Sequence, residues 1–273
     1  MKSKHAYVWH MLLIIAACMF LYPLVYMVFT SFKTIPEIFS SGLKLIPTDP
    51  TLDNYKRVME VIPLFLFIRN SLIVATIVMI AKIISSITVA YAVVFMDLKY
   101  KEAIFYAFTL TMFIPFTVTM LPNFITLTKF GLLNTLLGVS LPQLADAMGI
   151  FRIRQAMRGV PKSLVEAARI DNVHHTKALL RIVLPLIKPA VVAMCIFFFI
   201  DSWNQYFWPM LILRKREVYT ITLSMKDFLS SEGGMSWGSS IALATLTVLP
   251  PLVLYIFAQR YIISTFLSSG LKE

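Results

Sequence analysis

The sequence predicts an all-α integral membrane protein with six transmembrane helices, because of its composition and the length of its apolar runs. Of its 273 residues, 58% are hydrophobic and 14% are charged, and the mean hydropathy is +0.77. Soluble domains carry about 25% charged residues, so the composition excludes that class. The apolar residues gather into runs of about 20, the length that an α-helix needs to cross the hydrocarbon core of a bilayer.

Six runs have this length, although they are not equally apolar. The first is uncharged, the second contains Lys82, and the third contains Pro115 and Pro122. The fourth is the weakest because it holds several polar residues, among them Asp146. An even number of spans places both termini on the same side of the membrane. The expected spans are 8–30, 70–95, 104–128, 138 to about 156, 189–213 and 239–259.

The longest basic loop sets the orientation. Segment 152–188 carries eight of the chain's 25 Lys and Arg residues, close to the ends of two spans. Basic loops stay in the cytoplasm, so we expect this loop and both termini there. Residues 31–69 are then expected outside the cytoplasm, as an ordered cap with a short helix. The same charge distribution explains the net charge of +11 without a nucleic-acid partner.

No internal repeat or low-complexity linker divides the sequence, so we expect residues 1–273 to form one transmembrane domain with its core at 66–262. The first apolar run is too long for the hydrophobic region of a cleavable signal peptide, and it is expected to remain as an anchor. Cys18 and Cys195 both fall within apolar runs, which favours packing roles over a disulfide or a metal site.

A short helix is expected in the basic loop. Ser163 and Glu166 have the spacing of a capping box, and Pro161 before them is typical of a helix start. Asn172 suits the left-handed position that ends a helix. A helix of about nine residues is roughly 13 Å long, too short to cross the membrane, and it is marginal by itself in water. It therefore lies either against its own domain or in a groove of another protein, which its alanines would allow it to approach closely.

Several motifs of this chain resemble those of ABC-importer permeases of the carbohydrate type, the family of the maltose and glycerol-phosphate importers. The EAA loop of that family corresponds to residues 166–172 (EAARIDN) and 182–186 (IVLPL), followed by Pro189. The family usually has Gly where this chain has Asn172. The resemblance implies the type I ABC-importer permease fold with a cytoplasmic EAA coupling helix. Further similar stretches are 70–72 (NSL), 203–209 (WNQYFWP) and 259–261 (QRY).

The resemblance also implies a complex in the bacterial plasma membrane that imports a carbohydrate or glycerol-phosphate-type solute. The chain would pair with a second, homologous permease, two ATPase subunits would bind below, and an extracytoplasmic binding protein would deliver the solute. ATP and Mg would be held by the ATPase subunits, since this chain lacks the phosphate-binding pattern G-x-x-x-x-G-K-[ST].

The same resemblance assigns residues to these contacts. Residues 268–271 correspond to a tail that reaches toward the ATPase interface. Glu232, Gly233 and Gly234 would belong to a loop that faces the binding protein. The implied ATPase-coupling residues are Glu166, Ala167, Ala168, Ile170, Asp171 and Asn172.

Three ionisable residues fall near the middle of the expected spans: Lys82, Asp146 and Asp201. A charge at mid-depth is costly and marks a candidate functional site. Lys82 either forms a structural ion pair with one of the aspartates, reaches into a wet cavity, or helps to hold an anionic solute. The resemblance to glycerol-phosphate permeases favours glycerol 3-phosphate or a related phosphodiester over a neutral sugar.

Aromatic and polar residues alternate near the outer end of the fifth span. Trp203, Asn204 and Tyr206 combine ring faces with hydrogen-bonding groups, a mixture that suits sugars and is equally typical of an interfacial aromatic belt. For Trp208 the belt is favoured. Together with the three ionisable residues, the first three are the candidates for the translocation pathway.

Two other functional classes compete with an ABC permease. An ion-coupled secondary transporter would often show inverted repeats and paired broken helices, and only the third span carries prolines that could break it. A membrane enzyme needs a reactive constellation, yet the adjacent His174 and His175 lack H-E-x-x-H spacing and no G-x-S-x-G occurs. We expect a transport subunit, with exposed loop histidines, rather than an enzyme.

Overall fold

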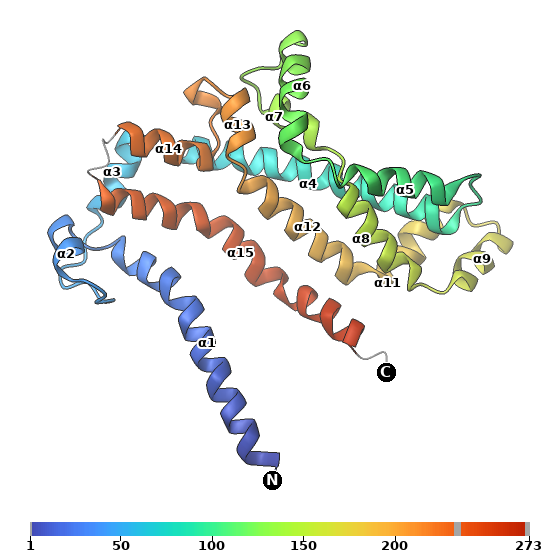
Figure 1. The fold of residues 1–273 in the computed structure, drawn as a ribbon, viewed down its shortest axis with the longest axis horizontal. Coiled ribbons are helices and arrows are strands. Elements are labelled where there is room, and N and C mark those ends of the chain that lie inside the picture. Colours follow the sequence, from blue (N-terminus) through green and yellow to red (C-terminus); the bar gives the residue numbers. More distant parts are fainter. Residues whose placement is uncertain (1, 232–235, 271–273) are drawn as a thin grey trace. The chain divides into compact units, whose positions relative to one another are not determined.

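The computed structural model describes residues 2–231 and 236–270 (Figure 1). Over these residues the chain is helical, with turns and loops but no strand, which confirms the expected all-α class. The chain divides into two compact units. Unit 1 comprises Met1–Leu66 and Leu223–Pro250, and unit 2 comprises Phe67–Thr222 and Pro251–Glu273.

Unit 1 contains the N-terminal helix and the segment expected to form a cap. Asn54 orders this segment because its Nδ2 donates to the carbonyl oxygens of Ser31 at 2.9 Å and Lys33 at 2.8 Å. Lys33 is fully buried and donates to Ser41 Oγ at 3.0 Å. The segment 31–69 is therefore ordered as expected, with two short helices where one was expected. The helices of unit 1 are α1 (Lys2–Thr30), α2 (Ile35–Ser40), α3 (Asp53–Val61), most of α14 (Ile221–Ser231) and the first part of α15 (Trp237–Gly270).

A carboxylate closes the loop that follows α2. Glu37 Oε1 accepts a hydrogen bond from the Thr48 backbone N–H at 2.6 Å. This hydrogen bond is the main cause that lowers the pKa of Glu37 below its usual value. The contact therefore stabilises the loop above the ordinary pKa of a glutamate and is lost as the pH falls through the lowered value.

Three helices are long and apolar enough to cross a membrane unaided. Their spanning stretches are Tyr7–Thr30 in α1, Leu64–Phe95, which is α4, and Trp237–Tyr261 in α15. They agree with the first, second and sixth expected spans. None of the apolar window in α1 is buried within the chain, so its side chains are left for lipid or for another subunit to cover.

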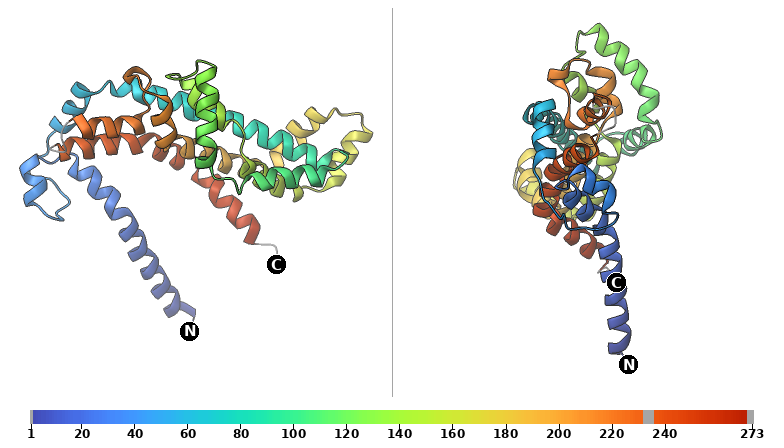
Figure 2. Two further views of the ribbon diagram at one scale, coloured as in Figure 1. Left: turned by 45° about the horizontal axis from the view of Figure 1, so that its top comes forward. Right: turned by 90° about the vertical axis from the view of Figure 1, so that its left-hand side faces the viewer.

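The third and fourth expected spans are bent pairs of helices rather than straight ones, and a further bent pair begins in the basic loop and overlaps the fifth expected span only in part. The bend between α5 (Lys101–Thr111) and α6 (Phe116–Lys129) is 91° and is visible in Figures 1 and 2. The segment Leu136–Gln143, which contains α7 (Leu136–Ser140), meets α8 (Ala147–Arg158) at 51°, and His175–Leu186 meets α12 (Lys188–Trp203) at 87°. The chain thus has up to six spans if each bent pair counts as one.

Particular residues account for these bends. Pro115 is the N-cap of α6, and a proline both lacks an N–H and disfavours the helical conformation of the residue before it. Asp146 begins α8 because its side chain accepts from the Gly149 N–H at 2.7 Å. The fifth expected span, 189–213, is also interrupted: α12 stops at Trp203, and a short helix, α13 (Phe207–Ile212), follows a polar break.

Unit 2 is held together by α4, α8 and α12. Helix α8 contacts both α5 and α12. Arg154 of α8 is bound to both carboxylate oxygens of Glu102 at 3.0 and 2.8 Å, and its guanidinium lies 3.8 Å from the ring centre of Phe105. The buried core of the unit includes Ile87, Tyr91, Ile153, Met157, Val183 and Phe198. The remaining elements are α9 (Lys162–Ile170), α10 (His175–Ala178), a π-helical turn (Leu179–Val183), α11 (Leu184–Leu186) and a 3-10 turn (Arg216–Val218).

Candidate functional site

The start of α9 differs from the sequence prediction. The helix has the expected nine residues, but its N-cap is Pro161, and no side chain caps it. The predicted capping box is therefore wrong, because Ser163 lies inside the first turn. Proline presets a helical φ, which starts the helix without the serine. The Glu166 carboxylate is consequently not used in a cap.

The end of α9 agrees with the prediction. Asn172 has a φ of 55°, the left-handed conformation that asparagine tolerates better than most residues. Its N–H donates to the Arg169 carbonyl at 3.0 Å, and the Val173 N–H donates to the Ala168 carbonyl at 2.9 Å. These bonds satisfy carbonyl groups that the last turn of a helix leaves open.

Helix α9 has a covered side and an uncovered side. Val165 and Ala168 are buried, with 2% and 6% of their surface exposed. On the other side Leu164 is 44% exposed, Ile170 is 81% exposed, and Ala167 lies exposed between them. The helix therefore covers its own domain with one side and leaves the other, the free face of α9 (Leu164, Ala167, Ile170), uncovered by the described residues.

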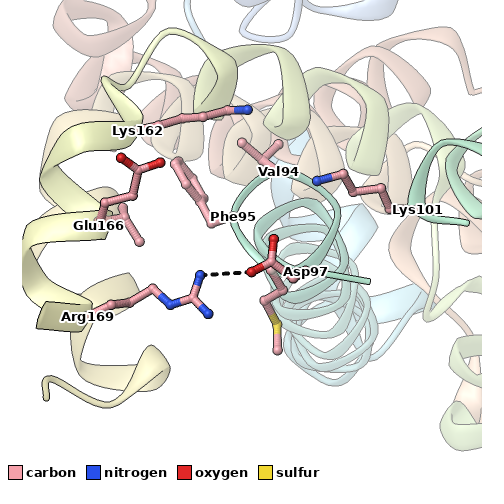
Figure 3. Close-up of a pocket in the computed structure, with 9 residues that line it drawn as sticks. Val94, Phe95, Asp97, Lys101, Lys162, Glu166 and Arg169 are labelled. Atoms are coloured by element: carbon pink, nitrogen blue, oxygen red, sulfur yellow. Dashed lines mark hydrogen bonds and ion pairs between the residues drawn. The ribbon is translucent and has the colours of Figure 1, made fainter. Parts of the chain in front are cut away.

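A charged cleft separates α9 from the end of α4 (Figure 3). Its volume is about 90 Å³. Figure 3 shows Arg169 extending across it to Asp97, with 3.2 Å between guanidinium and carboxylate. Glu166 lies on the same helix as Arg169 and has no ion pair among the described residues. The cleft is lined by Val94, Phe95, Met96, Asp97, Lys101, Lys162, Val165, Glu166 and Arg169.

A second contact joins the loop to α4. The Tyr91 hydroxyl lies 3.3 Å from His175 Nδ1, and the two rings meet edge to face at 6.0 Å between centres. His175 is half-buried, and His174 accepts at Nδ1 from the Thr176 N–H at 3.3 Å as the N-cap of α10. His174 is therefore exposed as expected, whereas His175 is half-buried against Tyr91. Sequence reasoning missed the pairing of Arg169 with Asp97 and of His175 with Tyr91, because the partners are 72 and 84 positions apart in the chain.

Within the membrane-spanning helices, Lys82 lies between Asp146 and Asp201. Its Nζ is 3.4 Å from Asp146 Oδ2 and 3.3 Å from Asp201 Oδ2, and it lies 5.2 Å from the ring centre of Phe198. The three residues, which we call the ion cluster, come from α4, the start of α8 and α12. The sequence did not decide which aspartate would pair with Lys82, and in the structure both lie within ion-pair distance of it.

Close packing holds the ion cluster in place. Gly149 follows Asp146 on α8, and a Cβ there would come within 2.4 Å of Phe198 Cζ and 2.6 Å of Ser86 Oγ. A larger residue would therefore require the Phe198 ring or the Ser86 side chain to move. Because Ser86 lies one turn after Lys82 on α4, this contact sets the spacing of the helices that carry the three charges.

The aromatic pathway candidates are not arranged alike. Trp203 is 2% exposed and stacks on Phe199 at 5.8 Å, so its ring is closed to a solute in this structure. Asn204 is exposed and Tyr206 is half-buried. Trp208 is 1% exposed and donates from Nε1 to the Val139 carbonyl at 3.0 Å. It is a core residue rather than the belt residue that was expected.

Some predicted contacts cannot be placed. The proposed binding-protein loop, Glu232, Gly233 and Gly234, lies outside the described residues. Of the proposed tail, residues 268–270 belong to α15, and residue 271 lies outside the described residues. No cluster of potential metal ligands occurs among the residues that the structure describes.

Comparison with known proteins agrees with this arrangement. Residues 82–265 match the family described as binding-protein-dependent transport system inner membrane component. Over 254 residues the chain is 31% identical to the arabinooligosaccharides transport system permease protein AraQ of Halalkalibacterium halodurans, covering 92% of this chain and 91% of that protein. Over 262 residues it is 29% identical to the sn-glycerol-3-phosphate transport system permease protein UgpE of Brucella melitensis, covering 93% of each.

A solved structure supports the fold. The chain matches a subunit of a bacterial ABC transporter involved in the import of the acidic polysaccharide alginate, with a TM-score of 0.83 and 23% identity. The match covers 95% of this chain and 96% of that chain. At this identity the likeness defines the fold, which is that of an ABC-importer permease.

These observations describe an integral membrane subunit of a transporter, and the chain belongs to the family of binding-protein-dependent transport system inner membrane components. It is a permease subunit of an ABC importer, and it acts in a complex with a binding protein and an ATPase. It is a transport subunit and not an enzyme, and nothing favours the alternative of an ion-coupled secondary transporter.

Proposed function

We propose that α9 is the coupling helix through which this permease receives the work of ATP hydrolysis from an ATPase subunit. The observation that supports this role is the free face of α9, on which two large apolar side chains flank the small Ala167 and are left uncovered. An exposed apolar patch of this kind marks an interaction site. The proposed contact consists of Glu166, Ala167, Ile170, Asp171 and Asn172; the expected Ala168 is left out because it is buried against the chain's own domain.

The charged cleft supports the same role. Glu166 has no ion pair within the described residues, and it lies at the rim of a cleft that also contains Lys101 and Lys162. Charged groups around a small apolar patch match the anatomy of protein interfaces, which have an apolar centre and a polar rim. The cleft therefore adds a polar rim beside the free face.

The proposed assembly follows from this contact. The chain pairs with a second, homologous permease, two ATPase subunits hold ATP and Mg, and an extracytoplasmic binding protein meets a loop that includes Glu232, Gly233 and Gly234. The basic loop and both termini lie in the cytoplasm of the bacterial cell, and residues 31–69 lie outside it. Residues 1–273 then act as one permease domain with its core at 66–262.

The solute is proposed to be of the carbohydrate or glycerol-phosphate type. Two relatives are permease proteins of transport systems for arabinooligosaccharides and for sn-glycerol 3-phosphate, and both compounds carry hydroxyl groups. Lys82, Asp146, Asp201, Asn204 and Tyr206 are the proposed pathway residues. Trp203 is left out because its ring is buried against Phe199.

A matched pair of substitutions tests the coupling contact. Ile170→Asp places a charge on the free face of α9, whereas Ile46→Asp places it on an isoleucine of similar exposure, 67% against 81%, between α2 and α3. We expect Ile170→Asp to lower the amount of ATPase that co-purifies with the permease at least tenfold, since a buried unpaired charge costs several kcal/mol. Ile46→Asp should leave it unchanged. Equal retention of the ATPase by both variants would remove α9 from the interface.

A further inference from the structure

The ion cluster lies deep in the membrane. Helix α4 has 32 residues, about 48 Å at ~1.5 Å per residue, and Lys82 is about 4 Å from its midpoint on the same scale. The hydrocarbon core is about 30 Å thick. Both aspartates lie at the same depth as Lys82, because they are within ion-pair distance of it.

The negative side of the cluster is the exposed side. The Lys82 side chain is 7% exposed, that of Asp146 is 24% exposed and that of Asp201 is 43% exposed. One ammonium group faces two carboxylates, so the ionised cluster carries one net negative charge, and that charge is carried on the open edge. A carboxylate this exposed at mid-depth cannot face hydrocarbon without a large cost, so its open edge faces water or another subunit.

Independent features near the cluster favour water. The hydroxyl groups of Ser86 and Ser202 are buried, and neither has a hydrogen-bond partner within the chain. Ser86 lies one turn from Lys82, and Ser202 follows Asp201. Buried hydroxyl groups in native proteins are nearly always satisfied by protein or by water. Asn204, one turn beyond Asp201, is exposed on the same side of the chain.

From these observations we propose that the edge formed by Asp201 and Asn204 lines the water-filled translocation path, and that the ion cluster gives this part of the path a negative potential. The negative potential assigns the solute to the neutral polyhydroxylated compounds, because it opposes the passage of phosphate esters. The inference rests on the proposed function, since it takes the exposed edge to belong to the path of an importer.

The rival interpretation makes the opposite prediction. If Lys82 held an anionic solute, its ammonium group would have to face the path with its charge uncompensated. In the structure it is the most buried member of the cluster, and two carboxylates lie within 3.4 Å of it. A positive path and a negative path differ in which charged reagent they attract, so the sign can be measured directly.

The test uses one cysteine placed on the proposed edge. Cys18 and Cys195 are replaced by alanine, and Asn204→Cys is introduced into the full chain, which is purified with its partner subunits. The cysteine is labelled with a cationic and an anionic methanethiosulfonate reagent of equal length. Each rate is divided by the rate with 2-mercaptoethanol, so that only the environment of the thiol affects the ratio of the two.

We expect the cationic reagent to label the cysteine about tenfold faster than the anionic one. Asp201→Asn, one helical turn away, should lower the ratio about tenfold, as expected for a unit charge at ~6 Å in water acting on reagents of opposite sign. Asp97→Asn removes the same charge beyond the end of α4, about 20 Å from Lys82, and it should leave the ratio unchanged.

Three results would overturn the inference. The anionic reagent could label faster, as an anion-binding Lys82 predicts; the two rates could be equal; or neither reagent could reach the thiol, which would mean that lipid or a subunit seals this edge. The sign of the ratio in the chain with Asp201 intact is informative even if Asp201→Asn fails to fold. Loss of the coupling contact would appear in the co-purification of the ATPase and not in these rates, so the two proposals fail separately.

Discussion

At the scale of single residues, Lys82 is the residue that balances the charges within the membrane-spanning helices. Its ammonium group is the only cation among the described residues that pairs with the carboxylates of Asp146 and Asp201. An ion pair buried in this way adds little net stability, but removal of one partner is strongly destabilising because it leaves charge uncompensated. The residue is therefore expected to matter first for folding, whatever it contributes to transport.

Lys82→Met should destabilise the chain by about 3–5 kcal/mol, measured as a lower thermal midpoint of the purified complex. The variant that also carries Asp146→Asn and Asp201→Asn should recover most of this loss. Asparagine keeps the side-chain oxygen that caps α8 and accepts from the Gly149 N–H, so the helix start survives the change. A triple variant as unstable as Lys82→Met would show that charge compensation is not the reason for the lysine.

At the scale of helices, α9 and α10 are joined to the end of α4 by two contacts. Arg169 of α9 pairs with Asp97, two residues beyond α4, and His175 of α10 meets Tyr91 of α4. The first is an exposed ion pair and the second is a half-buried hydrogen bond. An exposed ion pair contributes about 0.2–1 kcal/mol, which is too little to hold the fold together. It is enough to bias the position of a short helix that has few other contacts.

Asp97→Arg should loosen the link between α9 and α4, because it sets two arginines against each other. We expect the amount of solute transported per ATP hydrolysed to fall about two- to fivefold, in proportion to a loss near 1 kcal/mol, while ATPase binding is retained. Reversal of the pair, with Asp97→Arg and Arg169→Asp together, should restore the ratio. If Asp97→Arg transported as much solute per ATP as the unmodified chain, the Asp97–Arg169 pair would be a surface ion pair with no role in coupling.

The sequence predicted local features of these helices better than contacts between them. The length of α9 and the left-handed Asn172 follow from residues within a few positions, and so does the bend at Pro115. The N-cap at Pro161 was missed because both Pro161 and Ser163 are residues typical of a helix start. Residue propensities do not decide which of the two positions begins the helix. The burial of Trp203 and Trp208 and the pairs made by Asp97 and Tyr91 depend on helices that are distant in sequence, which periodicity does not report.

At the scale of the whole molecule, much apolar surface and one charged edge are left open. Helix α1 has no buried residue in its apolar window, and lipid can cover it. Lipid cannot cover the exposed edge at Asp201 without a large cost. The isolated chain is thus expected to be incomplete in the membrane, and a second permease would enclose the edge together with water.

The chain should therefore be less stable in membranes without its partner permease. In a pulse-chase experiment we expect its half-life to shorten severalfold when the partner is not co-expressed. The variant with Lys82→Met, Asp146→Asn and Asp201→Asn should depend less on the partner, because its edge is uncharged. A half-life of the unmodified chain that does not change with co-expression would argue against this arrangement.

The left-handed turn at Asn172 has a consequence for how motion would travel through the chain. Only four residues, 171–174, separate α9 from α10, and the turn bonds to the last carbonyls of α9 leave this junction little slack. A displacement applied to α9 would not be absorbed there. It would be transmitted to the 87° bend before α12 and would rotate α12. This part of the chain would then act as a rigid lever and not as a flexible linker.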